Sequence, residues 1–147
     1  MIKTKLLSIF ELSVFMVDGF NRFESNKKEF IYSFGIAFLS LPIIVLSMPF
    51  LRQYEESLME ISLLTVTALM ICKYFISLTI LTGFSYYICK ILKKKSRFYK
   101  LVTVSNWMSL IPLALFLPFL ILMMNGHYNY EQAYPFLIAI SLYSYAL

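Results

Sequence analysis

Residues 89–100 read Cys-Lys-Ile-Leu-Lys-Lys-Lys-Ser-Arg-Phe-Tyr-Lys, and this stretch decides the fold of the chain. It holds six of the thirteen Lys and Arg residues of the sequence and no acidic residue. On either side lies a segment that is too long and too apolar for the core of a soluble domain. Because loops rich in Lys and Arg stay on the cytoplasmic side of a membrane, we expect this loop to be cytoplasmic, which fixes the side of every other loop.

The composition is typical of an integral membrane protein. Of the 147 residues, 60% are hydrophobic and only 14% are charged, and the mean hydropathy is +0.74. These values lie well outside the range of soluble domains. The net charge of +5 is carried by residues that flank apolar spans, so we expect anionic lipid, and not nucleic acid, as the partner of the basic residues.

Four apolar segments predict an all-α polytopic bundle within residues 30–147, with spans at about 30–51, 61–84, 101–124 and 134–147. The second span could continue as one helix to Leu92. The last segment covers only about 21 Å at about 1.5 Å per residue, so we expect it to be short or truncated. The loops between the first and second spans and between the third and fourth carry one Lys or Arg between them, as expected for the outer side.

Prolines inside these spans are expected to bend them, because the ring removes a backbone donor and clashes with the preceding turn. The expected kinks are at Pro42, Pro112 and Pro118, whereas Pro49 lies where the first span is expected to end. Small side chains in the first span offer a neighbouring helix a close approach, and these are Gly35, Ala37 and Ser40.

Residues 1–29 are predicted to form a cytoplasmic amphipathic region ahead of the bundle. From about Lys3 to Phe20, apolar positions cover most of the helical circumference, and the polar positions fall on one stripe, namely Thr4, Ser8, Glu11 and Asp18. The segment is too short and too charged to span, so we predict one helix in the membrane interface. This helix either anchors the bundle or binds a partner protein.

Lys73 is the strongest candidate for a functional residue, because an ionisable group in hydrocarbon is costly unless it faces protein or water. A candidate polar site in the membrane is completed by Ser77 on the same helical stripe and by Asn106 and Ser109 on the third span. No Asp or Glu occurs in the four apolar segments, which disfavours a proton relay or a cation-coupled transporter. Lys73 then either snorkels or binds freed carbonyls, or it contacts an anion or a lipid headgroup.

Asn106 and Trp107 have two interpretations. In the first, the Trp lies in the interfacial belt and the Asn forms a hydrogen bond across helices. In the second, the pair belongs to a polar notch that opens to the cytoplasm, together with Thr103, Ser105, Ser109 and Pro112.

The sequence shows no pattern that carries catalysis or metal binding. His127 stands alone, Cys72 and Cys89 have no CxxC spacing, and no Gly-rich phosphate loop or nucleophile motif occurs. We therefore expect no enzyme activity, no metal and no cofactor. The residues expected to contact lipid headgroups are Lys90, Lys93, Lys94, Lys95, Arg97 and Lys100.

The segment at residues 103–112, Thr-Val-Ser-Asn-Trp-Met-Ser-Leu-Ile-Pro, resembles the Tyr-Ser-x-x-Pro type of segment in Yip1-domain membrane proteins. Those proteins also have a cytoplasmic amphipathic region ahead of a bundle of short spans. Here Asn106-Trp107 replaces the usual Gly-Tyr, and we count four segments where that family has five. The chain is also similar to small, uncharacterised bacterial inner-membrane proteins in which an Arg-Phe element, like Arg22-Phe23, follows a Phe-rich helix. The resemblance implies a membrane-organising or adaptor role without catalysis.

Two functions remain open at this point. The first is a multi-pass cell-membrane protein with a cytoplasmic N-terminus, which associates with other membrane proteins or with itself and with anionic lipid. The second is a small transporter or channel subunit for an anionic or neutral solute, with a path through Lys73 and the region of Asn106. With so few spans, a transporter of this kind would need to oligomerise.

Overall fold

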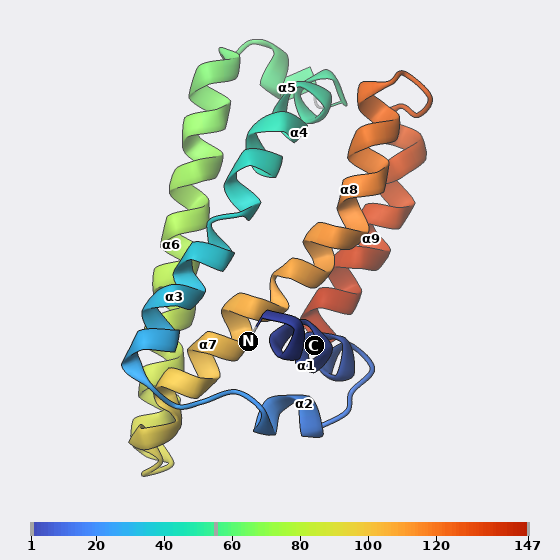
Figure 1. Cartoon of the computed structure of the whole chain (residues 1–147). Coiled ribbons are helices and arrows are strands. Elements are labelled where there is room, and N and C mark those ends of the chain that lie inside the picture. The colour runs from blue at the N-terminus through green and yellow to red at the C-terminus, as the bar shows by residue number, and fades with distance from the viewer. Residues whose placement is uncertain (1, 55, 147) are drawn as a thin grey trace. The chain divides into compact units, whose positions relative to one another are not determined.

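The computed structural model of the chain describes residues 2–54 and 56–146, without the side chains of residues 53, 54, 56, 57, 145 and 146. Within this part of the chain every regular element is a helix and no strand occurs, so the all-α prediction is confirmed (Figure 1). The elements are α1 (Ile2–Ser13), α2 (Asp18–Asn21), α3 (Lys27–Ala37), α4 (Ser40–Tyr54), α5 (Glu56–Met59), α6 (Leu63–Ile91), the 3-10 turn η1 (Lys95–Arg97), α7 (Phe98–Met108), α8 (Leu110–Met124) and α9 (Tyr130–Ala146).

Three helical stretches are long and apolar enough to cross a membrane, namely Lys27–Arg52, Leu63–Ile91 and Lys95–Met124. They cover the first three predicted segments except residues 61 and 62, and the expected extension of the second span is confirmed by the 29-residue helix α6. The fourth predicted segment lies in α9, which has 17 residues and ends at Ala146, while its last residue, Leu147, lies outside the described residues. It is not among the three stretches, so a fourth span stays a prediction.

These three stretches expose most of their apolar surface. In the most apolar 18-residue window of each, only 11%, 6% and 17% of the residues are buried inside the chain. Surfaces of this kind are stable in hydrocarbon or against other apolar helices, and not in water. By length, composition and exposure, the helices are those of a membrane protein.

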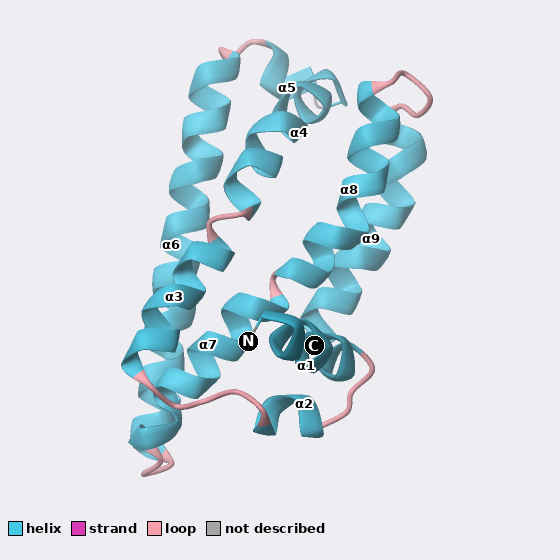
Figure 2. Cartoon of the chain, in the orientation of Figure 1, coloured by secondary structure: helices cyan, strands magenta, loops and turns pink. Residues whose placement is uncertain are grey.

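Two prolines coincide with breaks in the helices. Pro42 and Pro112 lie in the first turns of α4 and α8, and short non-helical links precede these helices (Figure 2). A proline ring clashes with the carbonyl group four residues before it, which belongs to Phe38 for Pro42 and to Met108 for Pro112. The helices α3 and α7 end at or just before these residues, so the interruptions expected near both prolines are found.

Two other prolines lie within continuous helices. Helix α8 runs through Pro118 without interruption, and the kink expected at this residue stays a prediction. Helix α4 runs through Pro49 and continues to Tyr54, so Pro49 does not end the helix itself. The stretch long and apolar enough to cross a membrane ends at Arg52, close to the expected end of the first span. In apolar surroundings the backbone has no water to bind, and a helix that loses one hydrogen bond still satisfies the rest of its groups.

The N-terminal region forms two helices, and the single helix predicted for residues 3–20 is wrong. Beyond the end of α1, Phe15 adopts a left-handed backbone conformation with a φ of 61°. The N–H groups of Phe15 and Met16 donate to the carbonyls of Leu12 and Glu11, both at 2.9 Å. These two bonds satisfy the free end of α1 and turn the chain before α2 begins.

The helices belong to two compact units. Unit 1 comprises Met1–Phe38 and Ser77–Ile111, and unit 2 comprises Leu39–Ile76 and Pro112–Ala146. Unit 1 carries eleven Lys and Arg residues against four acidic residues, which gives a formal charge of +7. Unit 2 carries two against four, which gives −2. The positive charge of the chain is therefore concentrated in unit 1.

Unit 2 contains α4, α5, α9, most of α8 and the first half of α6. Arg52 donates from Nε to the carbonyl of Leu58 at 3.3 Å and from Nη2 to that of Met59 at 2.9 Å, and so satisfies carbonyl groups at the end of α5. The rings of Phe119 on α8 and Phe136 on α9 stack with their centroids 4.9 Å apart. Unit 1 holds the candidate site.

Candidate functional site

Helices α3 and α7 form the most extensive helix pair of unit 1. Asn106 on α7 is 2% exposed, and its Nδ2 donates to Ser33 Oγ on α3 at 2.9 Å. The hydroxyl of Ser33 donates in turn to the carbonyl of Phe30 at 2.7 Å. Asn106 therefore makes the interhelical hydrogen bond that the first of its two interpretations predicts, and its burial leaves no open notch at this residue.

We expect Ser33→Ala to lower the free energy of unfolding by about 1–3 kcal/mol, because it leaves the buried Asn106 amide without its acceptor. Denaturant titration of the detergent-solubilised chain measures this change. Ser105→Ala is the matched control, since in the described part of the chain the Ser105 hydroxyl donates only within its own helix, to the carbonyl of Leu101. Equal losses in the two variants would contradict a structural role for the Ser33–Asn106 bond.

A small apolar core connects the N-terminal helices to α7. Its buried members are Ile9, Phe23, Val104 and Trp107. Trp107 is 7% exposed, so its ring packs against protein. Helix α1 folds back and contacts α7, a contact that the pattern of α7 alone does not reveal, and the position of Trp107 in the interfacial belt stays a prediction.

Helices α1 and α2 approach each other closely at Gly19. A Cβ atom on this residue would overlap the carbonyl oxygen of Ser8 and would lie 3.0 Å from Cγ of Leu12. Glycine is required because any side chain would push the two helices apart. At Gly35, by contrast, a Cβ would meet no atom within 4 Å. The close approach predicted there does not occur within the part of the chain that the structure describes.

An ion pair fixes α1 to the first turn of α3. Nζ of Lys5 lies 2.6 Å from Oε2 of Glu29, and the two side chains are only 8% and 18% exposed. The same ammonium lies 4.6 Å from the ring centroid of Phe23. A charge withdrawn from water to this degree is stable only with a partner of opposite charge at hydrogen-bond distance, so the pair determines where α1 docks.

A second ion pair joins α1 to the end of α2. Nη2 of Arg22 lies 2.7 Å from Oε1 of Glu11. Oε2 of Glu11 is buried and has no hydrogen-bond partner among the described residues. Glu11, which interrupts the apolar run of the N-terminal segment, is therefore turned inward and holds the two helices together.

Asn26 fixes the start of α3 and the polar edge of the site. Its Oδ1 accepts a hydrogen bond from the backbone N–H of Glu29 at 2.7 Å, which caps the helix. Its Nδ2 donates to Oε2 of Glu24 at 2.7 Å. One short side chain thus caps α3 at the backbone of Glu29 and holds the carboxylate of Glu24.

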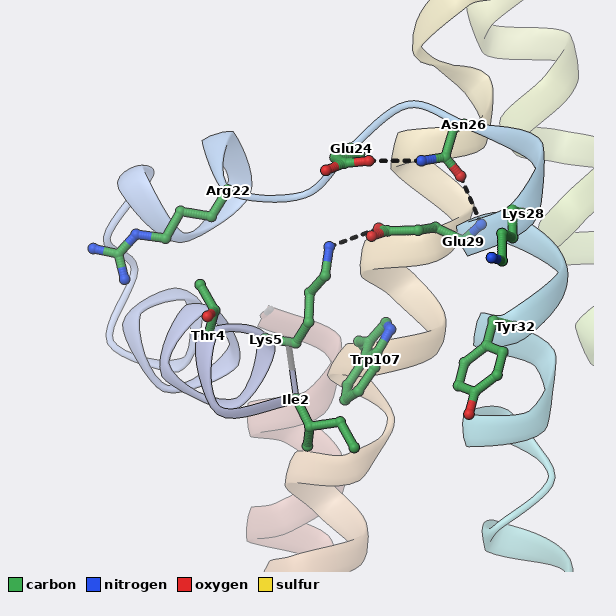
Figure 3. Close-up of a pocket in the computed structure, with 10 residues that line it drawn as sticks. All are labelled: Ile2, Thr4, Lys5, Arg22, Glu24, Asn26, Lys28, Glu29, Tyr32 and Trp107. Carbon is green, nitrogen blue, oxygen red and sulfur yellow. Dashed lines mark hydrogen bonds and ion pairs between the residues drawn. The ribbon is translucent and has the colours of Figure 1, made fainter.

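These elements enclose a cavity of about 630 Å³ in unit 1 (Figure 3). Figure 3 shows an amphipathic lining, with Glu24, Asn26 and Glu29 at one end and Tyr32 and Ile2 toward the other, beside Trp107. The guanidinium of Arg22 points away from the Lys5–Glu29 pair. The cavity is lined by Ile2, Thr4, Lys5, Arg22, Glu24, Asn26, Lys28, Glu29, Tyr32 and Trp107.

The basic loop divides into an exposed part and a docked part. Lys100 is half-buried, and its Nζ donates to the carbonyl of Asn21 at 3.3 Å and lies 4.8 Å from the ring centroid of Phe20. The hydroxyl of Ser25 donates to the carbonyl of Ser96. Lys100 therefore contacts α2, unlike the outward lipid contact predicted for it. The other predicted contacts are exposed, namely Lys90, Lys93, Lys94, Lys95 and Arg97.

The residues of the predicted polar site in the membrane are distributed over both units. Lys73 is exposed on the part of α6 that belongs to unit 2. Ser77, also exposed, begins the part of α6 that belongs to unit 1. Ser109 donates from its hydroxyl to the backbone carbonyl of Asn106 at 2.7 Å. The structure therefore joins Ser109 to Asn106, and the rest of this site stays a prediction.

The lining of the cavity offers ion pairing and hydrogen bonding. It contains three cations, two carboxylates, one amide and two aromatic rings. Such groups bind a charged or zwitterionic ligand by complementarity. Among the described residues, no group of three or more His, Cys, Asp or Glu is placed to hold a metal ion.

The Lys5–Glu29 pair and the Gly19 contact are the features that sequence reasoning missed. One signal was present, because Asn26 followed by Glu29 is the Asn-x-x-Glu spacing of a capped helix start and places Glu29 in a first turn. Lys5 carried no such signal, since its partner lies 24 residues away.

No protein-family model, curated protein or solved structure matches this chain.

Proposed function

We propose that the chain is a multi-pass membrane protein with a non-catalytic, membrane-organising role, and that its N-terminal hairpin lies in the cytoplasmic leaflet. The hairpin consists of α1, the turn after it and α2. The observation that carries the proposal is its outward apolar surface. Eight large side chains of the hairpin are each at least 50% exposed, and these are Ile2, Leu6, Leu7, Phe10, Val14, Phe15, Met16 and Val17.

The inward surface of the hairpin supports the same placement. Lys5 and Ser8 are buried, Lys5 pairs with Glu29 of α3, and Glu11 pairs with Arg22 at the end of α2. These polar side chains are therefore used within unit 1, and the apolar side is left outside. A free apolar surface of this kind is typical of a helix that lies in the interface, with its side chains in the acyl region. Each such side chain contributes about 1.5–3 kcal/mol when it leaves water.

The charge distribution supports the orientation. Unit 1 carries a formal charge of +7 and unit 2 carries −2. Lys and Arg are retained on the cytoplasmic side during insertion, and anionic lipids of that leaflet attract basic segments by about 1 kcal/mol per Lys or Arg near the surface. We infer that the exposed residues of the basic loop hold unit 1 against the headgroups.

In this role the protein acts by occupying area in one leaflet of the membrane. A hairpin inserted into one leaflet spreads the headgroups of that leaflet and leaves the other leaflet unchanged, which favours curvature. The expected adaptor role, with other membrane proteins or further copies of this chain as partners, uses the same exposed helices. The resemblance to Yip1-domain proteins implies this role as well and stays a prediction.

We expect Phe10→Asp/Val17→Asp to abolish the effect of the chain on vesicle shape, because both side chains are largely exposed, at 66% and 72%, and a carboxylate keeps the hairpin in water. The experiment reconstitutes the full chain in vesicles with anionic lipid and measures vesicle diameters by electron cryomicroscopy. The native chain should give smaller or tubular vesicles, and the variant should match protein-free vesicles.

Asn21→Asp is the matched control, since it adds a carboxylate at an exposed polar position of α2. It should retain most of the native effect. Vesicles unchanged by the native chain, or changed equally by the native chain and by Phe10→Asp/Val17→Asp, would contradict the proposed role.

The alternative function is a small transporter or channel subunit. It requires Asn106 to line a wet path, and the amide of Asn106 is buried and bonded to Ser33. We therefore prefer the membrane-organising role.

A further inference from the structure

We propose that the cavity of unit 1 binds the phosphoethanolamine headgroup of a membrane phospholipid, with the phosphate at Lys28 and the ammonium at Glu24. The proposal rests on the proposed function, which places unit 1 at the headgroups of the cytoplasmic leaflet. A headgroup site would give the chain a specific lipid ligand, whereas the membrane-organising role by itself requires only the lipid bilayer.

The charges of the lining carry the assignment. Of the three cations, Lys5 is paired with Glu29 and Arg22 with Glu11. Lys28 is exposed and forms no ion pair with any residue that the structure describes. Of the two carboxylates, Glu24 has, among the residues that the structure describes, only the neutral amide of Asn26 as its partner. The cavity thus leaves one positive and one negative group for a ligand, which matches a zwitterion with one phosphodiester and one ammonium.

The neighbouring groups favour a primary ammonium over a quaternary one. A carboxylate accepts hydrogen bonds from N–H donors, which ethanolamine has and choline lacks. A quaternary ammonium is recognised instead by a cage of aromatic faces. In Figure 3 the aromatic side chains, Trp107 and Tyr32, lie away from Glu24, so they do not form such a cage around it.

The apolar end of the cavity suits the rest of the lipid. Ile2 and Tyr32 are exposed at 62% and 66%, whereas Trp107 is buried. Tyr and Trp side chains are enriched at the membrane–water interface, where their rings lie at the level of the headgroups. The volume of about 630 Å³ is within the usual range for a small-molecule site.

Trp107 makes the site directly measurable, because it is the only tryptophan of the sequence and lines the cavity. The test places the full-length chain in detergent micelles and adds phospholipids with brominated acyl chains, which quench nearby tryptophan. We expect brominated phosphatidylethanolamine to quench Trp107 saturably at a low mole fraction. Phosphatidylcholine and phosphatidylglycerol with the same chains should need about tenfold more lipid.

Two variants and one control test the charges. Lys28→Gln and Glu24→Gln each remove one proposed contact from an exposed side chain, and each should weaken the quenching by phosphatidylethanolamine about tenfold. Lys27→Gln removes the same charge from the neighbouring exposed residue, which does not line the cavity. This control should bind like the native chain.

The outcomes separate the site from the proposed function. Equal quenching by all three lipids, unaffected by the variants, would overturn the headgroup site and leave unit 1 at the lipid surface. Quenching by none of the lipids would overturn both proposals. Displacement of the brominated lipid by water-soluble glycerophosphoethanolamine at an equal concentration would overturn the lipid as the ligand and assign a soluble phosphoester to the site.

Discussion

Replacing Lys5 by methionine is expected to lower the free energy of unfolding by about 3–5 kcal/mol. The substitution keeps an unbranched apolar stem and removes the ammonium, which leaves the carboxylate of Glu29 in a site that is mostly closed to water. A buried charge without its partner costs more than the pair contributes. The loss should appear in a denaturant titration of the detergent-solubilised chain followed by Trp107 fluorescence.

Two further variants define the origin of this effect. Lys3→Met removes the same charge from an exposed position of the same helix, and it should change the stability by less than about 0.5 kcal/mol. Lys5→Met/Glu29→Leu removes both charges and should recover most of the stability lost in Lys5→Met, because no unpaired charge remains. A double variant as unstable as Lys5→Met would show that packing of the Lys5 stem, and not the charge, holds α1 in place.

The substitution Gly19→Ala should separate the two helices of the hairpin. Its Cβ would overlap the backbone oxygen of Ser8 and would press on Leu12, and a backbone atom cannot yield as a flexible side chain can. We expect a loss of about 3 kcal/mol, at the upper end of the range for overpacked sites. Hydrogen exchange should show faster exchange of the amides of α1 and α2.

Gly35→Ala is the matched control for this prediction. A Cβ at Gly35 meets no atom within 4 Å, and alanine favours a helix by about 1 kcal/mol over glycine. The control should therefore be neutral or slightly stabilising. A similar loss in both variants would point to a general effect of glycine replacement and contradict the close helix contact at Gly19.

The long helices could be predicted from the sequence because their signal is local. Length and apolarity along one segment are enough to recognise α6, including its extension to Ile91. The breaks near Pro42 and Pro112 are also local, since the clash of a proline ring falls four residues earlier. Pro49 and Pro118 show the limit of this rule, because both lie within continuous helices, and the loss of one hydrogen bond need not end a helix.

The candidate site could not be predicted because it is made by contacts between distant residues. Lys5 and Glu29 are 24 residues apart, and Ser33 and Asn106 are 73 apart. The apolar periodicity of residues 3–20 also runs through the turn at Phe15, where no glycine or proline marks a helix end. Lys73, by contrast, was predicted as a functional residue only because it is a charged residue in an apolar segment, and the structure gives it an exposed position in unit 2.

The turn at Phe15 has a consequence for selection. A left-handed conformation costs an L-residue about 1–2 kcal/mol, and glycine avoids this cost. The chain nevertheless has phenylalanine there, 65% exposed and beside Met16 and Val17. Laboratory evolution for thermal stability in detergent would favour glycine at this position, whereas selection for membrane attachment would retain the aromatic ring. The residue that each selection retains at this position would show whether stability or membrane attachment determines the sequence of the hairpin.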